Sequence, residues 1–213
     1  SSSTGIYLVD ELIRLKKDVF ATTYSKYDEK FYRAKGVRYA SVNIAKEIDF
    51  DKLPKVGVEA VVLLAGILPA NLDEYSPAFY KNYIDVNIQG TLNALEYCRI
   101  NNIKKIIFAS SHSDVSGYWN TGIKITEDFP RKINYRGDHA TYIISKIAAM
   151  DLIEHYNQEY GLNGVIFRLP AVYGYFPRTG IYVEGKFVKA GLNIFIEKAI
   201  NGDAIELWGN PRK

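Results

Sequence analysis

The sequence predicts an α/β protein whose strands form a doubly wound parallel sheet, covered on both faces by helices. Two apolar runs, AVVLLA at residues 60–65 and KIIFA at residues 105–109, are typical of strands buried on both faces. Helical patterns lie between the strand-like segments, and this alternation favours a parallel sheet. Parallel sheets of this kind bind ligands at the carboxyl ends of their strands, where the strand order reverses.

The first third of the chain begins with an amphipathic helix. At residues 6–15, apolar Leu8, Leu12 and Ile13 recur at helical spacing, whereas Asp10 is polar. The elements expected after this helix are a strand at 18–23, a short helix at 28–34 ended by Gly36, a strand at 37–42, a weak helical turn at 50–53 stopped by Pro54, and the buried strand at 60–65.

The rest of the chain continues the alternation and then changes in composition. The expected elements are a long helical region at 76–100 with room for one break, a strand at 105–109, a helix at 138–160 ended by Gly161, a strand at 164–168, a helix at 188–200 and a short strand at 204–207. Gly, Pro and Tyr gather at residues 174–180. We therefore expect one domain at residues 1–174 and the start of a second at residues 175–213.

Composition and charge exclude several classes of function. The chain has 213 residues, 47% of them hydrophobic, which is enough for one core and the beginning of another. The net charge is +3, and because Lys and Arg form no run, nucleic-acid binding is not expected. The one cysteine, Cys98, cannot form an internal disulfide and fits a reducing compartment. Without an apolar run of membrane-spanning length or a signal peptide, we expect a cytoplasmic protein with no membrane partner.

A tyrosine and a lysine in the predicted helix at 138–160 form the main candidate for chemistry. Tyr142 and Lys146 are four residues apart, so their side chains share one face of that helix. An ammonium beside a phenol favours the phenolate and lowers the phenol pKa from its reference value of about 10. The preceding strand ends in Ser110 and Ser111, whose hydroxyls are suited to hold the oxygen whose proton moves.

Two other patterns have little chemical meaning. Tyr182 and Lys186 repeat the four-residue spacing, but Gly185 between them disfavours a helix, so we interpret this pair as a coincidence. His112 lies beside Ser111, yet the chain has three histidines and lacks a Cys/His ligand spacing, so no metal site is expected.

The chain opens with SSSTG at residues 1–5, directly before the first helix. This stretch is consistent with the end of a glycine-rich turn, whose N–H groups and following helix N-terminus would face a pyrophosphate. Only Gly5 remains of the three glycines that such a turn usually has. A serine-rich tag or helix cap explains the same five residues equally well.

Seven short motifs, in order along nearly the whole chain, resemble the extended short-chain dehydrogenase/reductase family, in its NAD-dependent epimerase/dehydratase group. The motifs are TGIYLV at 4–9, LAG at 64–66, DVNIQGT at 85–91, FASS at 108–111, YIISK at 142–146, RLPAVYG at 168–174 and IELWGN at 205–210. The resemblance implies a Rossmann-like dinucleotide-binding domain at residues 1–174 and the beginning of a substrate-binding domain at residues 175–213.

The resemblance also implies roles for particular residues. Tyr142 would be the general acid/base, and Lys146 would lower its pKa and hold the nicotinamide ribose. Ser111 would bind the reacting oxygen, with Ser110 and Ser113 as alternatives because the loop is one residue longer than usual. The residues implied to contact the cofactor are Gly5, Thr23, Lys26, Asn43, Ile44, Leu64, Ala65, Gly66, Asn87, Tyr142, Lys146 and Pro170.

Four features differ from the family pattern. The first strand and most of the glycine-rich loop are missing, and the chain stops at Lys213, where the family continues; we therefore expect a fragment or the ordered part of a longer chain. Thr23 stands where NAD-preferring members have an acid, and Lys26 is near, so the sequence leans to NADP over NAD. Ala171 replaces an Asn that is common in sugar-nucleotide enzymes.

The resemblance predicts a nicotinamide-dependent epimerase or reductase/dehydrogenase that acts on a secondary alcohol or ketone of a sugar or nucleotide sugar. Dehydration ranks third, because HSDV at residues 112–115 lacks the Asp-Glu pair of the dehydratases. The alternatives are a catalytically silent NAD(P)-binding or scaffold module and a mainly structural subunit. In each case the resemblance implies a homodimer, formed through the long helices at 76–100 and 139–160.

Overall fold

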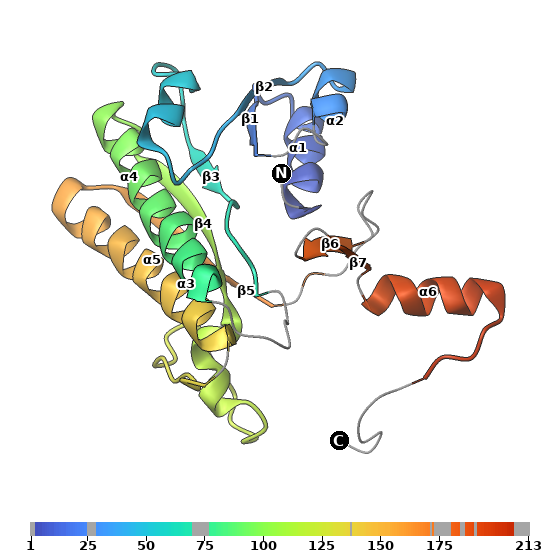
Figure 1. Cartoon of the computed structure of the whole chain (residues 1–213). Coiled ribbons are helices and arrows are strands. Elements are labelled where there is room, and N and C mark those ends of the chain that lie inside the picture. Colours follow the sequence, from blue (N-terminus) through green and yellow to red (C-terminus); the bar gives the residue numbers. More distant parts are fainter. Residues whose placement is uncertain are drawn as a thin grey trace. The chain divides into compact units, whose positions relative to one another are not determined.

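The computed structural model describes residues 3–24, 29–69, 77–136, 138–170, 172, 180–183, 186–189 and 191–206 (Figure 1). The chain divides into two compact units, Ser1–Ala171 and Val172–Lys213. The boundary expected at Gly174 lies outside the described residues, three positions from this division. That the first unit binds a dinucleotide and the second begins a substrate domain stays a prediction.

The first unit alternates helices and strands in the expected order. Its elements are α1 (Ser3–Arg14), β1 (Phe20–Thr23), α2 (Glu29–Ala34), β2 (Arg38–Ser41), a 3-10 helix (Glu47–Lys52), β3 (Val61–Leu63), α3 (Pro77–Tyr83), a π-helix (Ile84–Gln89), α4 (Gly90–Ile100), β4 (Lys105–Ser111), a second 3-10 helix (His112–Tyr118), α5 (Asp138–Tyr160) and β5 (Asn163–Leu169). The break expected in the helical region at 76–100 is the π-helix between α3 and α4.

All strand pairs of the first unit are parallel, which confirms the predicted α/β class. In the described residues, β1 pairs with β2, and β3, β4 and β5 form a separate sheet in that order. The usual doubly wound order is 3-2-1-4-5-6. If strand 1 of that order is left out, strands 2 and 3 form one parallel sheet and strands 4, 5 and 6 form another. The described strands have the same neighbours: β1 and β2 correspond to strands 2 and 3, and β3, β4 and β5 correspond to strands 4, 5 and 6.

Helices α4 and α5 lie side by side against one face of the three-stranded sheet (Figure 1). The core between them includes Leu95, Ile106 and Ile153, all fully buried. Gly164 in β5 allows α5 to approach closely, because a Cβ there would lie 2.5 Å from Ile153 Cγ2. On the opposite face, Phe167 of β5 is 50% exposed. This packing fixes where the first turns of α5 stand relative to the end of β4.

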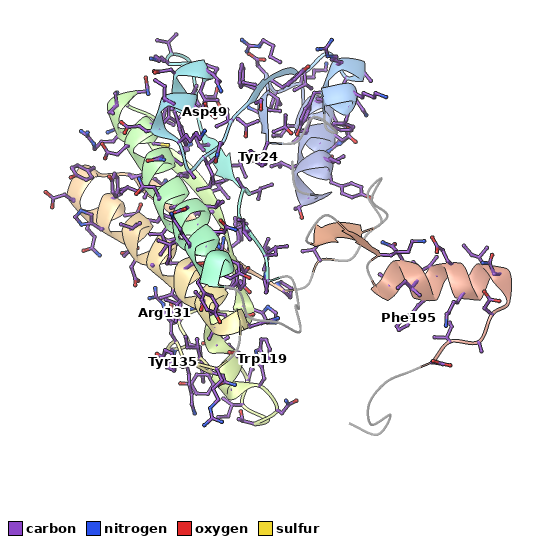
Figure 2. The ribbon with its side chains drawn as sticks, in the orientation of Figure 1. Tyr24, Asp49, Trp119, Arg131, Tyr135 and Phe195 are labelled. Carbon is purple, nitrogen blue, oxygen red and sulfur yellow. The ribbon has the colours of Figure 1, made fainter. Side chains whose placement is uncertain are left out.

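The second unit differs from the expectation. Strands β6 (Gly180–Val183) and β7 (Lys186–Lys189) form an antiparallel hairpin, so the helix expected at 188–200 begins later, as α6 (Gly191–Asn201). Aromatic and β-branched residues favour strands here and outweigh the helical pattern of residues 188–190. Residues 204–206 form no strand, contrary to the prediction, and residue 207 lies outside the described part. Figure 2 shows the side chains of α6, among them Phe195.

Because Tyr182 lies in β6 and Lys186 in β7, they do not share a helix face, and this agrees with the expectation that Gly185 disfavours a helix there. The described helices include none that is both long enough and apolar enough to cross a membrane. Within the same residues, no group of three or more His, Cys, Asp or Glu side chains is arranged to hold a metal ion.

Candidate active site

The carboxyl end of β4 and the first turns of α5 bring Ser111 and Tyr142 together. The phenol of Tyr142 lies close enough to the hydroxyl of Ser111 for that hydroxyl to act on its pKa. Its ring is 6% exposed and packs edge-on against Tyr83, with ring centroids 6.0 Å apart. Burial raises the pKa of Tyr142, because it disfavours the charged phenolate, while the nearby hydroxyl of Ser111 lowers the pKa by a smaller amount. The phenol is therefore held in its neutral form at neutral pH.

Lys146 lies on the same helix but has a different partner from the one expected. Its ammonium donates a hydrogen bond of 2.6 Å to the carbonyl oxygen of Ala109 and lies 4.0 Å from the ring centroid of Phe108. Burial lowers the pKa of Lys146 to about 8. The ammonium is not among the causes that shift the pKa of Tyr142, so the expected lowering by Lys146 is not found in this structure. The strand carbonyl competes for the ammonium, and helix spacing alone could not reveal that.

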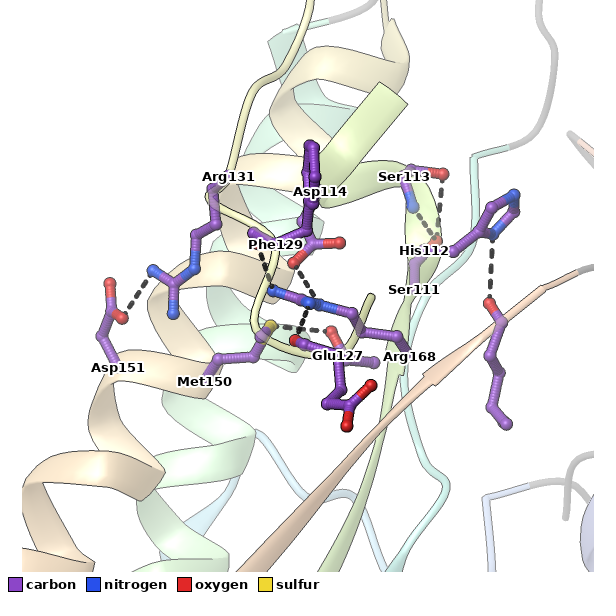
Figure 3. Close-up of polar contacts among 12 residues, drawn as sticks. Ser111, His112, Ser113, Asp114, Glu127, Phe129, Arg131, Met150, Asp151 and Arg168 are labelled. Atoms are coloured by element: carbon purple, nitrogen blue, oxygen red, sulfur yellow. Dashed lines mark hydrogen bonds and ion pairs between the residues drawn. The ribbon is translucent and has the colours of Figure 1, made fainter. Parts of the chain in front are cut away.

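The serines around the end of β4 have distinct environments. Ser110 is buried, and its hydroxyl donates to Met150 Sδ at 3.0 Å, so it lies in the core. Ser111 caps the following 3-10 helix, and its Oγ accepts a hydrogen bond of 3.2 Å from the N–H of Ser113. The hydroxyls of Ser111 and Ser113 are also hydrogen-bonded, at 3.0 Å (Figure 3). Of the three candidate serines, Ser111 is the one that influences the pKa of Tyr142.

Asn87 ties the loop after β3 to α5. It lies in the π-helix, is 2% exposed, and its Oδ1 accepts from the N–H of Ile67 at 2.8 Å. Its Nδ2 donates to Ile67 O at 3.1 Å and to Ser145 Oγ at 2.9 Å. Ser145 in turn donates to Tyr142 O at 2.7 Å. The amide thus places the loop residues directly beside the turn of α5 that carries Tyr142.

Gly66 leaves space beside this network. A Cβ at Gly66 would lie 3.1 Å from Asn87 Oδ1 and 3.9 Å from Lys146 Nζ. Because glycine lacks that atom, the exposed backbone at Ala65 and Gly66 can approach a ligand near the Lys146 ammonium. Leu64 is partly buried in the same loop, and Pro170 is exposed directly after β5. The structure therefore places these expected cofactor contacts after the carboxyl ends of β3 and β5.

The other expected cofactor contacts lie elsewhere in the first unit. Asn43 is held locally, since its N–H donates to Asp49 and its Oδ1 accepts from the N–H of Ala45. Ile44 is buried and packs closely against Gly90. A Cβ added at Gly90 would lie 2.7 Å from the Cδ1 atom of Ile44.

The N-terminal candidates differ in where they lie. Gly5 is buried within α1 rather than in a turn before it, and Thr23 ends β1 and is 3% exposed. Lys26 lies outside the described residues.

A buried ion pair missed in the sequence fixes the segment between β4 and α5. Arg168 Nε donates to Asp114 Oδ2 at 2.9 Å, and Asp114 is 2% exposed. The Arg168 guanidinium also donates to the carbonyl oxygens of Glu127 and Phe129 (Figure 3). Trp119, in the same segment, stacks on His112, with ring centroids 4.9 Å apart (Figure 2). The one sequence signal for this pair was the acid three residues beyond the end of one strand and the arginine near the end of the next.

Comparison with known proteins places these features in a family. The sequence model of the NAD-dependent epimerase/dehydratase family matches residues 1–213. A putative UDP-glucose 4-epimerase of Methanocaldococcus jannaschii is 28% identical over 207 residues, which are 97% of this chain and 63% of that protein. The chain thus spans less than two thirds of that relative. A GDP-mannose 3,5-epimerase of Arabidopsis thaliana is 27% identical over 129 residues, 58% of this chain and 32% of that protein.

Solved structures show the same fold. A UDP-glucose 4-epimerase from Thermotoga maritima with UDP-glucose has a TM-score of 0.75 and 23% identity, covering 97% of this chain and 62% of that one. A Thermus thermophilus UDP-glucose 4-epimerase in complex with NAD has a TM-score of 0.71 and 24% identity, with 94% and 60% covered. These likenesses confirm the Rossmann-like architecture. Because the family model matches its whole length, this chain belongs to the NAD-dependent epimerase/dehydratase family.

Proposed function

We propose that this chain carries the acid/base centre of a nucleotide-sugar epimerase, which oxidises one secondary alcohol of the sugar and reduces the resulting ketone from the other face. The observation that supports this most directly is the buried phenol of Tyr142 at the carboxyl end of β4, where Ser145 donates to Tyr142 O and Ser111 acts on the pKa of the phenol. Ligands of parallel α/β sheets bind at that edge. The family match and the UDP-glucose 4-epimerases among the relatives support the same class of reaction.

In the proposed reaction, Tyr142 moves the proton of the reacting hydroxyl. As phenolate it accepts that proton during oxidation, and as phenol it returns a proton to the ketone oxygen during reduction. Ser111 holds the same oxygen and donates to it as negative charge develops. Because burial raises the pKa of Tyr142, the resting phenol is set up for the reducing direction, and ionisation depends on donors such as Ser111.

The residues present fit a nicotinamide dinucleotide. The loop at Ala65 and Gly66 is exposed beside the Lys146 ammonium, and a side chain at position 66 would crowd Asn87. Lys146 would bind the nicotinamide ribose, and Pro170 would pack against the ring. NAD bound there would supply the hydride acceptor for oxidation and the hydride donor for reduction. The family name and the relatives in complex with NAD favour NAD over the NADP to which Thr23 and Lys26 point.

The substrate class rests on the relatives rather than on side chains of this chain. UDP-glucose and UDP-glucuronic acid 4-epimerases are among the similar structures, so a UDP-sugar is the first substrate to test. Ala171, which departs from the usual Asn, lies outside the described residues. A dehydrogenase that releases the ketone, or a reductase, would use the same acid/base pair and differs only in whether the oxidised sugar leaves.

The test is turnover of UDP-glucose to UDP-galactose with NAD, compared among the wild type, Tyr142→Phe and Tyr160→Phe. Tyr160 lies at the end of the same helix and is 43% exposed, so it is the matched control. We expect Tyr142→Phe to lower kcat at least 100-fold, as loss of an acid/base group does, with an unchanged Kd for NAD. Turnover retained by Tyr142→Phe would rule out the mechanism. Net accumulation of NADH with oxidised sugar would instead assign a dehydrogenase.

One observation favours a second candidate, a catalytically silent module that binds NAD(P) or scaffolds a partner. Lys146 bonds to Ala109 O, and the pKa of Tyr142 is raised rather than lowered. Titration with NAD(H) and NADP(H), followed by tryptophan fluorescence, distinguishes the candidates. Saturable binding without turnover of any UDP-sugar would support the silent module, and the tighter dinucleotide decides between NAD and NADP.

A further inference from the structure

His112 stands at the carboxyl ends of β4 and β5 and has no role in the proposed reaction. It follows Ser111, the last residue of β4, and Ser111 pairs in register with Leu169, the last residue of β5. His112 and Pro170 are therefore the first residues beyond the paired ends of these strands. The ligands of a parallel α/β sheet bind at this edge, and His112 is partly exposed there.

Two contacts hold the imidazole ring of His112. Its Nδ1 lies 3.2 Å from the carbonyl oxygen of Leu169, so the side chain reaches from the end of β4 to the end of β5 (Figure 3). The ring also stacks on the indole of Trp119, with ring centroids 4.9 Å apart and 25° between the planes. A hydrogen bond at one edge and a stack on one face leave the ring little freedom to rotate. The position of the second nitrogen, Nε2, is thereby fixed as well.

The partner of Nδ1 decides what Nε2 offers. A carbonyl oxygen accepts and cannot donate, so Nδ1 carries the ring hydrogen and donates it to Leu169 O. In the neutral ring, Nε2 then has a lone pair and is a hydrogen-bond acceptor. Within the described part of the chain, the bond to Leu169 is the one hydrogen bond of this side chain. The imidazole therefore presents a fixed acceptor at the edge where ligands bind.

The backbone on both sides of His112 is held in place. Ser111 Oγ accepts a hydrogen bond of 3.2 Å from the N–H of Ser113 and so caps the 3-10 helix. Asp114, which is 2% exposed, is paired with Arg168 of β5 at 2.9 Å. Because the ring and its backbone are ordered before a ligand arrives, a ligand that bonds to Nε2 loses little binding free energy in ordering them.

We propose that His112 is a specificity-determining residue, whose Nε2 accepts a hydrogen bond from a sugar hydroxyl that does not react. The proposal rests on the proposed function, because its ligand is the sugar of the nucleotide sugar. Tyr142 lies in the first turns of α5, whereas His112 follows β4, so the two side chains are suited to different oxygen atoms of one sugar. A site built to bond a hydroxyl discriminates against ligands that lack it, since its own polar group is then left unpaired.

The test compares the binding of UDP-glucose and of UDP to the full chain loaded with NAD, by calorimetry. Tyr142→Phe serves as the parent, because loss of turnover leaves UDP-glucose intact during the titration. UDP lacks the sugar, so its Kd reports on the rest of the site and on the integrity of the fold. Substitutions at His112 are introduced into this parent. His155→Asn, at an exposed position of α5, is the matched control.

Three substitutions separate the two ring nitrogens of His112. His112→Asn keeps an amide N–H that can donate to Leu169 O, but its shorter side chain has no atom at the place of Nε2. His112→Gln reaches the place of Nε2 with an amide oxygen, which accepts. His112→Phe keeps a ring that can stack on Trp119 and has neither nitrogen.

We expect His112→Asn and His112→Phe to raise the Kd of UDP-glucose about 3- to 10-fold, the effect of one neutral hydrogen bond, with the Kd of UDP unchanged. His112→Gln should recover most of the loss, and His155→Asn should change neither value. An unchanged Kd of UDP-glucose in His112→Asn would overturn the proposal. An equal rise in the Kd of UDP would also overturn it, because the role of His112 would then be structural. Failure of the proposed function has a different result: the parent would bind neither ligand, which would reject both proposals.

Discussion

At the scale of single residues, the proposed chemistry depends on two titratable groups whose pKa values burial shifts in opposite directions. Burial raises the pKa of Tyr142 and lowers the pKa of Lys146 to about 8, because a low-dielectric surrounding disfavours both charged forms. The four-residue spacing predicted that the phenol and the ammonium interact with each other, but in the structure each has a different partner. Ser111 acts on the pKa of Tyr142, whereas Lys146 donates a hydrogen bond to Ala109 O.

The buried ammonium should cost the folded state stability at neutral pH. The pKa of Lys146 falls from 10.5 to about 8, which corresponds to about 3 kcal/mol before its own hydrogen bond is counted. We therefore expect Lys146→Met to raise the free energy of unfolding at pH 7 by about 1–3 kcal/mol while it abolishes turnover. Urea denaturation of both proteins measures the difference.

This advantage of Lys146→Met should change with pH in a defined window. Below pH 8, both states of the wild type hold the proton, and the full cost is present. Between about pH 8 and 10.5, the unfolded state holds more protons than the folded state, so wild-type stability rises with pH and the difference shrinks. Lys105→Met, at the exposed start of β4, is the matched control for removal of a lysine side chain. A difference independent of pH would contradict the burial of a charged Lys146.

At the scale of secondary structure, the π-helix between α3 and α4 holds the site together. Its extra residue per turn is rare, and π-helical turns are frequent at functional sites. Here it includes Asn87, whose amide joins the loop after β3 to α5 through Ile67 and Ser145. In the described residues, the helical region at 76–100 is interrupted once, as expected. Its π-helical form and its role in joining the loop to α5 depend on the contacts of Asn87 with Ile67 and Ser145, which are 20 and 58 residues away in the sequence.

Removal of the Asn87 amide should loosen this junction. Asn87→Ala leaves buried donors and acceptors of Ile67 and Ser145 without partners, and we expect a loss of about 2–4 kcal/mol in the free energy of unfolding. Asn82→Ala, at an exposed position of α3, is the matched control and should change stability by less than about 0.5 kcal/mol. Urea denaturation compares the two. Equal losses would show that the amide network contributes nothing specific.

At the scale of the whole molecule, two compact units carry different parts of the family pattern. Ser1–Ala171 contains the two parallel sheets and the proposed acid/base centre, and Val172–Lys213 contains the hairpin and α6. The usual doubly wound order separates the pair β1–β2 from β3–β5 by one strand. In the described residues, β1 and β3 are each at an edge of their sheet.

We expect a homodimer formed through α3, α4 and α5, as the family resemblance implies. Ile84 in the π-helix between α3 and α4, and Ile100 at the end of α4, expose 45% and 67% of their surface, which a partner would cover. Ile84→Glu combined with Ile100→Glu should therefore shift the mass measured by light scattering from dimer to monomer. Ile200→Glu on α6, where Ile200 is 78% exposed, is the control and should leave the dimer intact. A monomeric wild type would contradict the expectation.

The sequence by itself determined the order and type of most elements in the first unit, because their apolar periodicities differ and their ends carry Gly or Pro. It also indicated Tyr142, Lys146 and Ser111, through helix spacing and the strand that precedes them. Only the tertiary structure decided that Lys146 turns to Ala109 O and that Ser110 enters the core beside Met150. It also decided that residues 186–189 pair as a strand. These outcomes depend on which groups compete for the same hydrogen bond or the same buried face, and that competition arises only when segments distant in the sequence pack together.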